Sequence, residues 1–157
     1  MKTVQEKVEE LIQFINNTMK EMRLDATDVF MNGNCGNMYT IFAKFFRKEA
    51  VIPYEILYNG EPYHIFTKIN EDFYDISGKT SLDKYIDYLR KNNSNMEFSK
   101  RDFELKEIDI SDRYHRIKQQ SNMYAYDEDY EQSCIENQMN SLNRKIEELI
   151  KSKEAEI

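Results

Sequence analysis

Three short segments rich in aromatic and β-branched residues follow one another closely between residues 54 and 76. Their sequences are YEILY (54–58), YHIFTKI (63–69) and FYDI (73–76), a composition typical of β-strands. The pair Asn59-Gly60 follows the first segment and Asn70-Glu71-Asp72 follows the second, and both are typical of hairpin turns. The sequence therefore predicts an antiparallel meander, which limits the fold to one that contains a small antiparallel sheet.

The segments before the meander repeat apolar residues with a helical period. Residues 2–23 place apolar side chains at steps of three and four between charged ones, which predicts an amphipathic helix. Residues 25–34 (DATDVFMNGN) end with an Asn-Gly turn signal and are predicted as a loop. A second helix is predicted over residues 35–48, with Asn34 as its N-cap and with these residues on its buried face: Met38, Ile41, Phe42, Phe45 and Phe46.

The segments after the meander predict further helices and one more strand. A helix should begin after Ser81, and residues 103–110 (FELKEIDI) are predicted as a fourth strand. The remainder of the chain is predicted as helical. Together these patterns predict an α+β fold in one compact domain, in which the helix that carries the cysteine packs on the sheet. Residues 1–110 should form the core, and residues 111–157 a helical segment packed on it.

The last predicted helix carries a narrow apolar seam with strict four-three spacing. The seam consists of Ile135, Met139, Leu142, Ile146 and Leu149. Such spacing is typical of a coiled coil, although just over two heptads are short for one that forms independently. Two uses are therefore expected: packing against the rest of the domain, or a homodimer formed through the C-terminal helix.

The composition argues against several classes of function. The 157 residues carry a net charge of −7, which opposes direct binding to nucleic acid. No apolar run is long enough to span a membrane, and the N-terminus lacks the pattern of a secretory signal. The two cysteines and two histidines stand singly, without metal-ligand spacing. We therefore expect free thiols, no metal, no cofactor and a cytoplasmic protein.

Cys35 lies in the sequence GNCGN (33–37), directly before a helical run. His64 lies in the second predicted strand and Asp75 in the third, so a hairpin can place them side by side. In such a set a thiolate attacks a carbonyl, an imidazole moves the proton, and a carboxylate orients the imidazole. A helix N-terminus and a neighbouring imidazolium both favour the thiolate form. We predict Cys35, His64 and Asp75 as catalytic residues, and expect the two glycines to leave space for substrate beside the sulfur.

An acyl-transfer site also needs hydrogen-bond donors for the negative oxygen that forms on the attacked carbonyl. The backbone amide of Cys35 can supply one donor. A side-chain amide near the cysteine can supply another, and three asparagines are candidates: Asn32, Asn34 and Asn37.

The order of these motifs resembles the papain-like and transglutaminase-like cysteine enzymes. In that superfamily a G-x-C motif opens a helix, as GNCGNMYTIFAKFF does here, and the partners follow on successive strands, as in HIFTKINEDFYDISG. The layout G-x-C…H…YD-x-x-G is most similar to small bacterial and phage members. The resemblance covers residues 33–78. It implies a minimal core of that fold, a protease, deamidase or transamidase acting on a protein or peptide, and a bacterial cell or phage-infected host. The glutamine that serves the oxyanion in papain-type enzymes has no match upstream of Cys35.

The alternative hypothesis is a non-enzymatic protein that binds another protein. The segment YAYDEDYE (124–131) combines acids and tyrosines without a base, which suits contact with a basic partner. Its candidate contact residues are Tyr124, Tyr126, Asp127, Glu128, Asp129, Tyr130 and Glu131. Such a surface could inhibit a host defence protein or a nucleic-acid-binding protein, as some phage-encoded inhibitors do. The reactivity of Cys35 distinguishes the two hypotheses.

Overall fold

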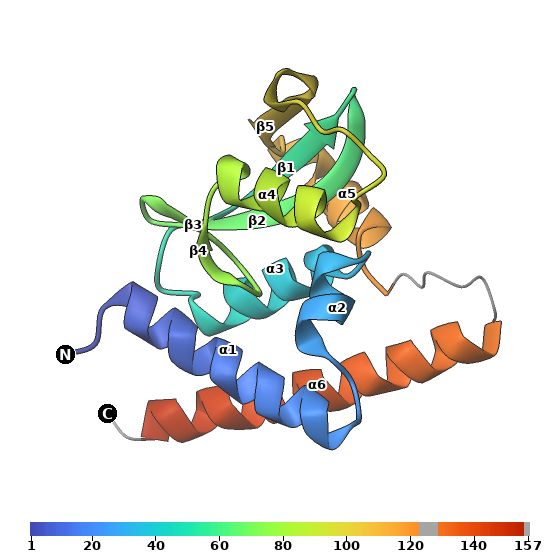
Figure 1. The fold of residues 1–157 in the computed structure, drawn as a ribbon. Coiled ribbons are helices and arrows are strands. Elements are labelled where there is room, and N and C mark those ends of the chain that lie inside the picture. The colour runs from blue at the N-terminus through green and yellow to red at the C-terminus, as the bar shows by residue number, and fades with distance from the viewer. Residues whose placement is uncertain (123–128, 156–157) are drawn as a thin grey trace.

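The computed structural model describes residues 1–122 and 129–155, with only the backbone for residues 129–135 and 155. The described chain contains a five-stranded antiparallel sheet in the order β4-β3-β2-β1-β5 (Figure 1). Its strands are β1 (Val51–Tyr58), β2 (Glu61–Ile69), β3 (Asp72–Asp75), β4 (Gly78–Thr80) and β5 (Phe103–Glu107). Its helices are α1 (Val4–Glu21), α2 (Ala26–Met31), α3 (Cys35–Phe45), α4 (Leu82–Asn92), α5 (Arg113–Gln119) and α6 (Asp129–Ala155), with the short 3-10 helices η1 (Lys100–Asp102) and η2 (Ile110–Asp112). The prediction of an α+β fold with a small antiparallel sheet and helical ends is confirmed.

Two tight turns build the meander, as predicted. At Asn59 and Gly60 the φ angles are 49° and 82°, and a type I′ hairpin turn requires positive φ at both central residues. Asn70 after β2 also has a positive φ of 57°, and its side-chain amide donates to Glu49 at 3.0 Å. The sequence does not predict β4, because its three residues, Gly-Lys-Thr, show no apolar alternation and are held by their pairing with β3.

The connection between α1 and α3 contains a helix where a loop was predicted. α2 begins after Asp25, whose carboxylate accepts hydrogen bonds from two backbone amides of the first helical turn. Phe30 and Met31 at the end of α2 are buried in the hydrophobic core. The loop prediction for residues 25–34 is therefore wrong for α2, because the aspartate cap and the burial of these side chains stabilise a helix too short to show a clear period.

Two predicted elements are shorter in the structure. α3 ends at Phe45 and not at residue 48, because the backbone turns there on its way into β1. β5 ends at Glu107 and not at residue 110, because its pairing with β1 ends opposite Tyr54. In both cases the neighbouring element, and not local propensity, sets the end.

α1 and α6 lie side by side and run in opposite directions, so that the two termini lie near each other (Figure 1). Ion pairs join the two helices: Lys145 with Glu21 at 3.8 Å, and Lys153 with Glu10 at 3.7 Å. The side chain of Ile135 lies outside the described residues. Three other side chains of the predicted seam are buried in the core: Met139, Leu142 and Ile146. This part of the seam packs within the chain, and a homodimer through the C-terminal helix stays a prediction.

The central strand β2 is buried over its middle residues, and α3 packs on it. The ring of Tyr85 in α4 stacks on His64 of β2. Cys35 at the start of α3 packs with Ile65 of β2 and with Ile117 of α5. The middle of β2 is thus the place where the starts and ends of several helices meet.

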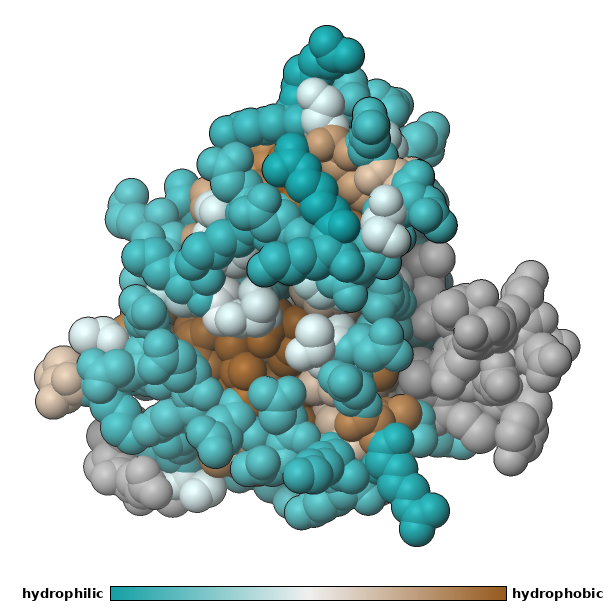
Figure 2. Space-filling model, viewed as in Figure 1, coloured by the Kyte–Doolittle hydropathy of each residue, from teal (hydrophilic) through white to brown (hydrophobic). Residues whose placement is uncertain are grey.

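The surface is largely hydrophilic on the face shown in Figure 2. The largest group of hydrophobic residues on this face lies between the sheet and α1, with smaller patches near the top and at the lower right of the view. No helix among the described residues is long and apolar enough to cross a membrane.

Candidate functional site

His64 and Asp75 meet on neighbouring strands of the sheet. The ring nitrogen Nε2 of His64 lies 3.1 Å from Oδ2 of Asp75, and both side chains are buried. The other carboxylate oxygen of Asp75 accepts the backbone N–H of Ser77 at 2.8 Å and also the Ser77 hydroxyl. The turn after β3 therefore holds Asp75 in place, and the register of β2 and β3 brings the imidazole to it.

Cys35, the first residue of α3, lies beside His64. The cysteine is only 2% exposed, in a small cluster with Ile65 and Ile108, and it is close enough to His64 to help raise the pKa of the imidazole. Nδ1 of His64, the nitrogen that does not face Asp75, is buried and has no hydrogen-bond partner among the described residues. Such a nitrogen calls for an explanation, because buried polar atoms are normally paired. The structure thus brings the three predicted catalytic residues into one buried group.

The electrostatics of this group favour a charged imidazole. Burial opposes the charge, but the hydrogen bond to Asp75 and the interaction with Cys35 outweigh it and raise the pKa of His64 to about 9. Tyr85 stacks on the imidazole with ring centroids 4.6 Å apart and planes 1° from parallel. Burial raises the pKa of the Tyr85 phenol, which is therefore neutral. His64 carries a proton near neutral pH, as a general acid needs.

The raised pKa of His64 predicts a pH-dependent stability. Because the folded pKa of about 9 lies above the ordinary value of 6.5, this group stabilises the folded state fully below about pH 6.5 and loses the contribution as the pH rises through about 9. Between about pH 6 and about pH 10, we expect the wild type to lose on the order of 1–3 kcal/mol relative to His64→Gln. Urea unfolding of both proteins measures the difference. If the difference in unfolding free energy between the wild type and His64→Gln is the same at both pH values, Asp75 and Cys35 do not stabilise the charged form of His64.

The three asparagines expected as oxyanion donors occupy different environments. The amide of Asn32 donates to the backbone carbonyl of Asp28 at 2.8 Å and to its carboxylate at 3.0 Å. Asn37 pairs with Asn122 in both directions: its amide donates at 3.0 Å, and its oxygen accepts the Asn122 backbone N–H at 2.7 Å. Asn34 is buried at the N-cap position, but its side chain makes no capping hydrogen bond to α3. Asn32 and Asn37 are therefore engaged in contacts that hold the local backbone.

Gly36 allows the end of α5 to lie directly on the start of α3. Its N–H donates to the backbone carbonyl of Gln120 at 2.7 Å. A Cβ at this position would lie 2.3 Å from the carbonyl oxygen of Ile117, so no larger residue fits unless that backbone moves. The space beside Gly36 therefore accommodates α5, and not substrate as the sequence suggested.

This close approach brings Gln120 to the sulfur of Cys35. The side-chain oxygen Oε1 of Gln120 lies 3.6 Å from Sγ of Cys35. Gln120 also lines a pocket of about 540 Å³, together with Gly33 and Tyr85. Gln120 therefore contacts both the Cys35 sulfur and this pocket, whose lining does not include Cys35 or His64.

Sequence reasoning missed Gln120. The resemblance to papain-type enzymes directs the search for a glutamine to the chain before the cysteine, whereas Gln120 follows Cys35 by 85 residues. No local motif marks it, because only the packing of α5 on α3 brings it to the sulfur. The pair of glycines around Cys35 is the one available signal, since Gly36 marks a close approach of another backbone.

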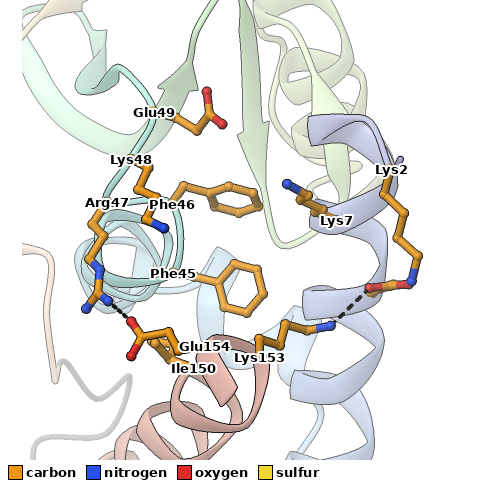
Figure 3. A pocket seen from close by; sticks show the side chains of 11 residues that line it. Lys2, Lys7, Phe45, Phe46, Arg47, Lys48, Glu49, Ile150, Lys153 and Glu154 are labelled. Carbon is orange, nitrogen blue, oxygen red and sulfur yellow. Dashed lines mark hydrogen bonds and ion pairs between the residues drawn. The ribbon is translucent and has the colours of Figure 1, made fainter. Parts of the chain in front are cut away.

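A second pocket, of about 240 Å³, lies near the two termini (Figure 3). Phe45 and Phe46 provide apolar lining, and charged side chains surround it, among them Arg47, which pairs with Glu154. This pocket shares no residue with the triad or with the pocket at Gln120. It is therefore not part of the candidate catalytic site.

The acidic, tyrosine-rich segment lies largely outside the described residues. Residues 124–128 are not described, and Asp129, Tyr130 and Glu131 are described only as helical backbone. Their role in partner contact stays a prediction. Within the described ranges, no group of three His, Cys, Asp or Glu side chains could hold a metal ion.

Comparison with known protein families gives a match over much of the chain. A family model described as Phage YunG-like protein matches residues 11–112, more than half of the 157-residue chain. The matched range includes Cys35, His64 and Asp75 but ends before Gln120. Comparison with curated proteins and with solved structures found no match. The extent of the family match shows that this chain is a member of the Phage YunG-like protein family.

Proposed function

We propose that this protein is a thiol-dependent acyl-transfer enzyme in which Cys35 is the nucleophile, His64 the general acid and base, and Asp75 the residue that orients His64. One observation carries the proposal. The imidazole is held by Asp75 at 3.1 Å, lies beside the Cys35 thiol, and has a second nitrogen with no hydrogen-bond partner among the described residues. Hydrolysis or transfer of an ester, thioester or amide is the chemistry that such a group performs.

The proposed reaction has two steps. The Cys35 sulfur attacks the carbonyl carbon as a thiolate, beside the protonated His64, and forms a C–S bond. When the resulting intermediate collapses, the bond to the leaving amine or alkoxide breaks and the leaving group takes the proton from His64. Water or an amine then attacks the thioester and gives its proton to His64, and the sulfur leaves as a thiolate. Attack by water makes the enzyme a protease or deamidase, and attack by an amine makes it a transamidase.

Gln120 is the proposed side-chain donor to the negative oxygen of the intermediate. Its amide lies 3.6 Å from the sulfur, and half a turn of the amide would present Nε2 in place of Oε1. The backbone N–H of Cys35, at the start of α3, is the second proposed donor. The pocket that Gln120 lines is the proposed route of a substrate to the sulfur of Cys35, which is only 2% exposed.

An activated ester tests the proposal without a known substrate. p-Nitrophenyl acetate should acetylate Cys35 about 100-fold faster than Cys134, and nitrophenolate should appear in a burst equal to the protein concentration. Peptide mass spectrometry identifies the acetylated thiol. Cys35→Ala should abolish the burst, and Cys134→Ala should retain it. Equal, slow acetylation of both cysteines in the folded wild type would contradict the proposal.

A binding protein without catalytic activity is the second candidate, and the burial of Cys35 favours it. In that case the thiol, the imidazole and the carboxylate are core residues, and the segment 124–131 contacts a host protein. Membership in a phage family agrees with an inhibitor of a host defence or nucleic-acid-binding protein. The acetylation experiment separates the two candidates, because a core thiol has no means of reacting faster than an ordinary one.

A further inference from the structure

The pocket at Gln120 is lined by aromatic rings. They belong to Tyr63, Tyr85, Tyr88 and Phe98. Tyr85 and Tyr88 stack on each other, with ring centroids 6.4 Å apart and planes 23° from parallel, and Tyr85 also stacks on His64. The face of an aromatic ring attracts a cation through its quadrupole. Because Tyr85 is only 3% exposed and already stacks on His64, the more exposed ring of Tyr88 is the one suited to a flat, positively charged group.

Asp28 is the only charged residue among the described residues that line this pocket. The lining thus contains a carboxylate and no cation to balance it. One of its oxygens accepts from the amide of Asn32 at 3.0 Å. After burial, the negative charge of Asp28 is the next cause that raises the pKa of the Tyr88 phenol. The Asp28 carboxylate is therefore close enough to the Tyr88 ring to affect it electrostatically.

We infer that this pocket selects an acyl substrate with a cationic side chain, and that arginine fits it best. A guanidinium is planar, so it can stack on Tyr88 while it donates two parallel hydrogen bonds to Asp28. The pocket, of about 540 Å³, has room for such a side chain. The inference rests on the proposed function, because Gln120 joins this pocket to the Cys35 sulfur.

Binding is tested apart from the reaction in Cys35→Ala, which cannot form an acyl-enzyme. The probe is N-acetyl-arginine amide, and its control is N-acetyl-citrulline amide, which has nearly the same shape without the charge. We expect the arginine probe to bind at least about ten-fold more tightly, as followed by NMR shifts of the pocket residues. When Asp28→Asn is combined with Cys35→Ala, the preference for the arginine probe over the citrulline probe should disappear. Adding Asp83→Asn, which changes an exposed carboxylate outside the pocket, should keep it.

Turnover by the wild type separates this inference from the proposed function. The methyl ester of N-acetyl-arginine should be hydrolysed with a kcat/KM at least about ten-fold above that of the citrulline ester. If the two amides bind equally and the two esters are hydrolysed equally, the inference about the pocket is wrong, but the proposed enzymatic function still stands. An arginine preference that persists in Asp28→Asn would overturn the inference about the pocket as well. If the arginine probe binds preferentially but neither ester is hydrolysed, the pocket is selective for arginine and the proposed enzymatic function is wrong.

Discussion

Replacing His64 with Ala is expected to slow acetylation of Cys35 by p-nitrophenyl acetate about 10²–10⁴-fold, the range that general acid–base catalysis supplies. The imidazole, with its pKa raised to about 9 by Asp75 and Cys35 against the effect of burial, provides both the neighbouring charge and the proton. The alanine variant retains neither. The initial rate of nitrophenolate release, measured at equal protein concentration, gives the ratio.

Two further variants test whether this loss is specific. Asp75→Asn should cause a smaller loss, since an amide can still fill the position next to Nε2 but holds the imidazole less well. His115→Ala, which removes an exposed histidine of α5, should leave the rate unchanged. If folded His64→Ala is acetylated as fast as the wild type, His64 does not activate Cys35, and the binding protein becomes the better account.

Replacing Leu142 with Ala is expected to lower the free energy of unfolding by about 2–5 kcal/mol. Leu142 of α6 is fully buried in the same core cluster as Leu11 and Ile15 of α1 and Phe42 of α3. Truncation leaves a cavity between three helices whose positions are set by other contacts, so the gap cannot close easily. Because a domain of this kind is stable by only about 5–15 kcal/mol, the change is a large part of the total. The urea midpoint and slope measure it.

An exposed residue of the same helix provides the matched control. Glu148→Ala changes the helix surface without opening the core, and its effect should stay within about 0.5 kcal/mol. If Leu142→Ala behaves like the control, α6 does not belong to the core in solution, and its apolar seam is available for a second copy of the chain.

Much of the sheet can be predicted from the sequence because its information is local. Asn59-Gly60 admits the positive φ angles that a tight hairpin turn needs, and these angles are found. The turn at residues 70–71 aligns β2 with β3, so the approach of His64 to Asp75 follows from the order of motifs. β4 and α2 escape prediction because neither contains enough residues to show a period, and both are stabilised by residues elsewhere in the chain.

The sequence by itself determined the meander, the helix that begins at Cys35 and the set of three residues that the hairpin and helix can bring together. Each of these depends on side chains a few positions apart, through turn geometry and apolar period. Only the tertiary structure decided that α6 packs on α1, that Gly36 accommodates α5, and that Gln120 lies 3.6 Å from the Cys35 sulfur. These features depend on contacts between segments far apart in the chain, and such contacts form only where the summed burial of a whole core favours one arrangement.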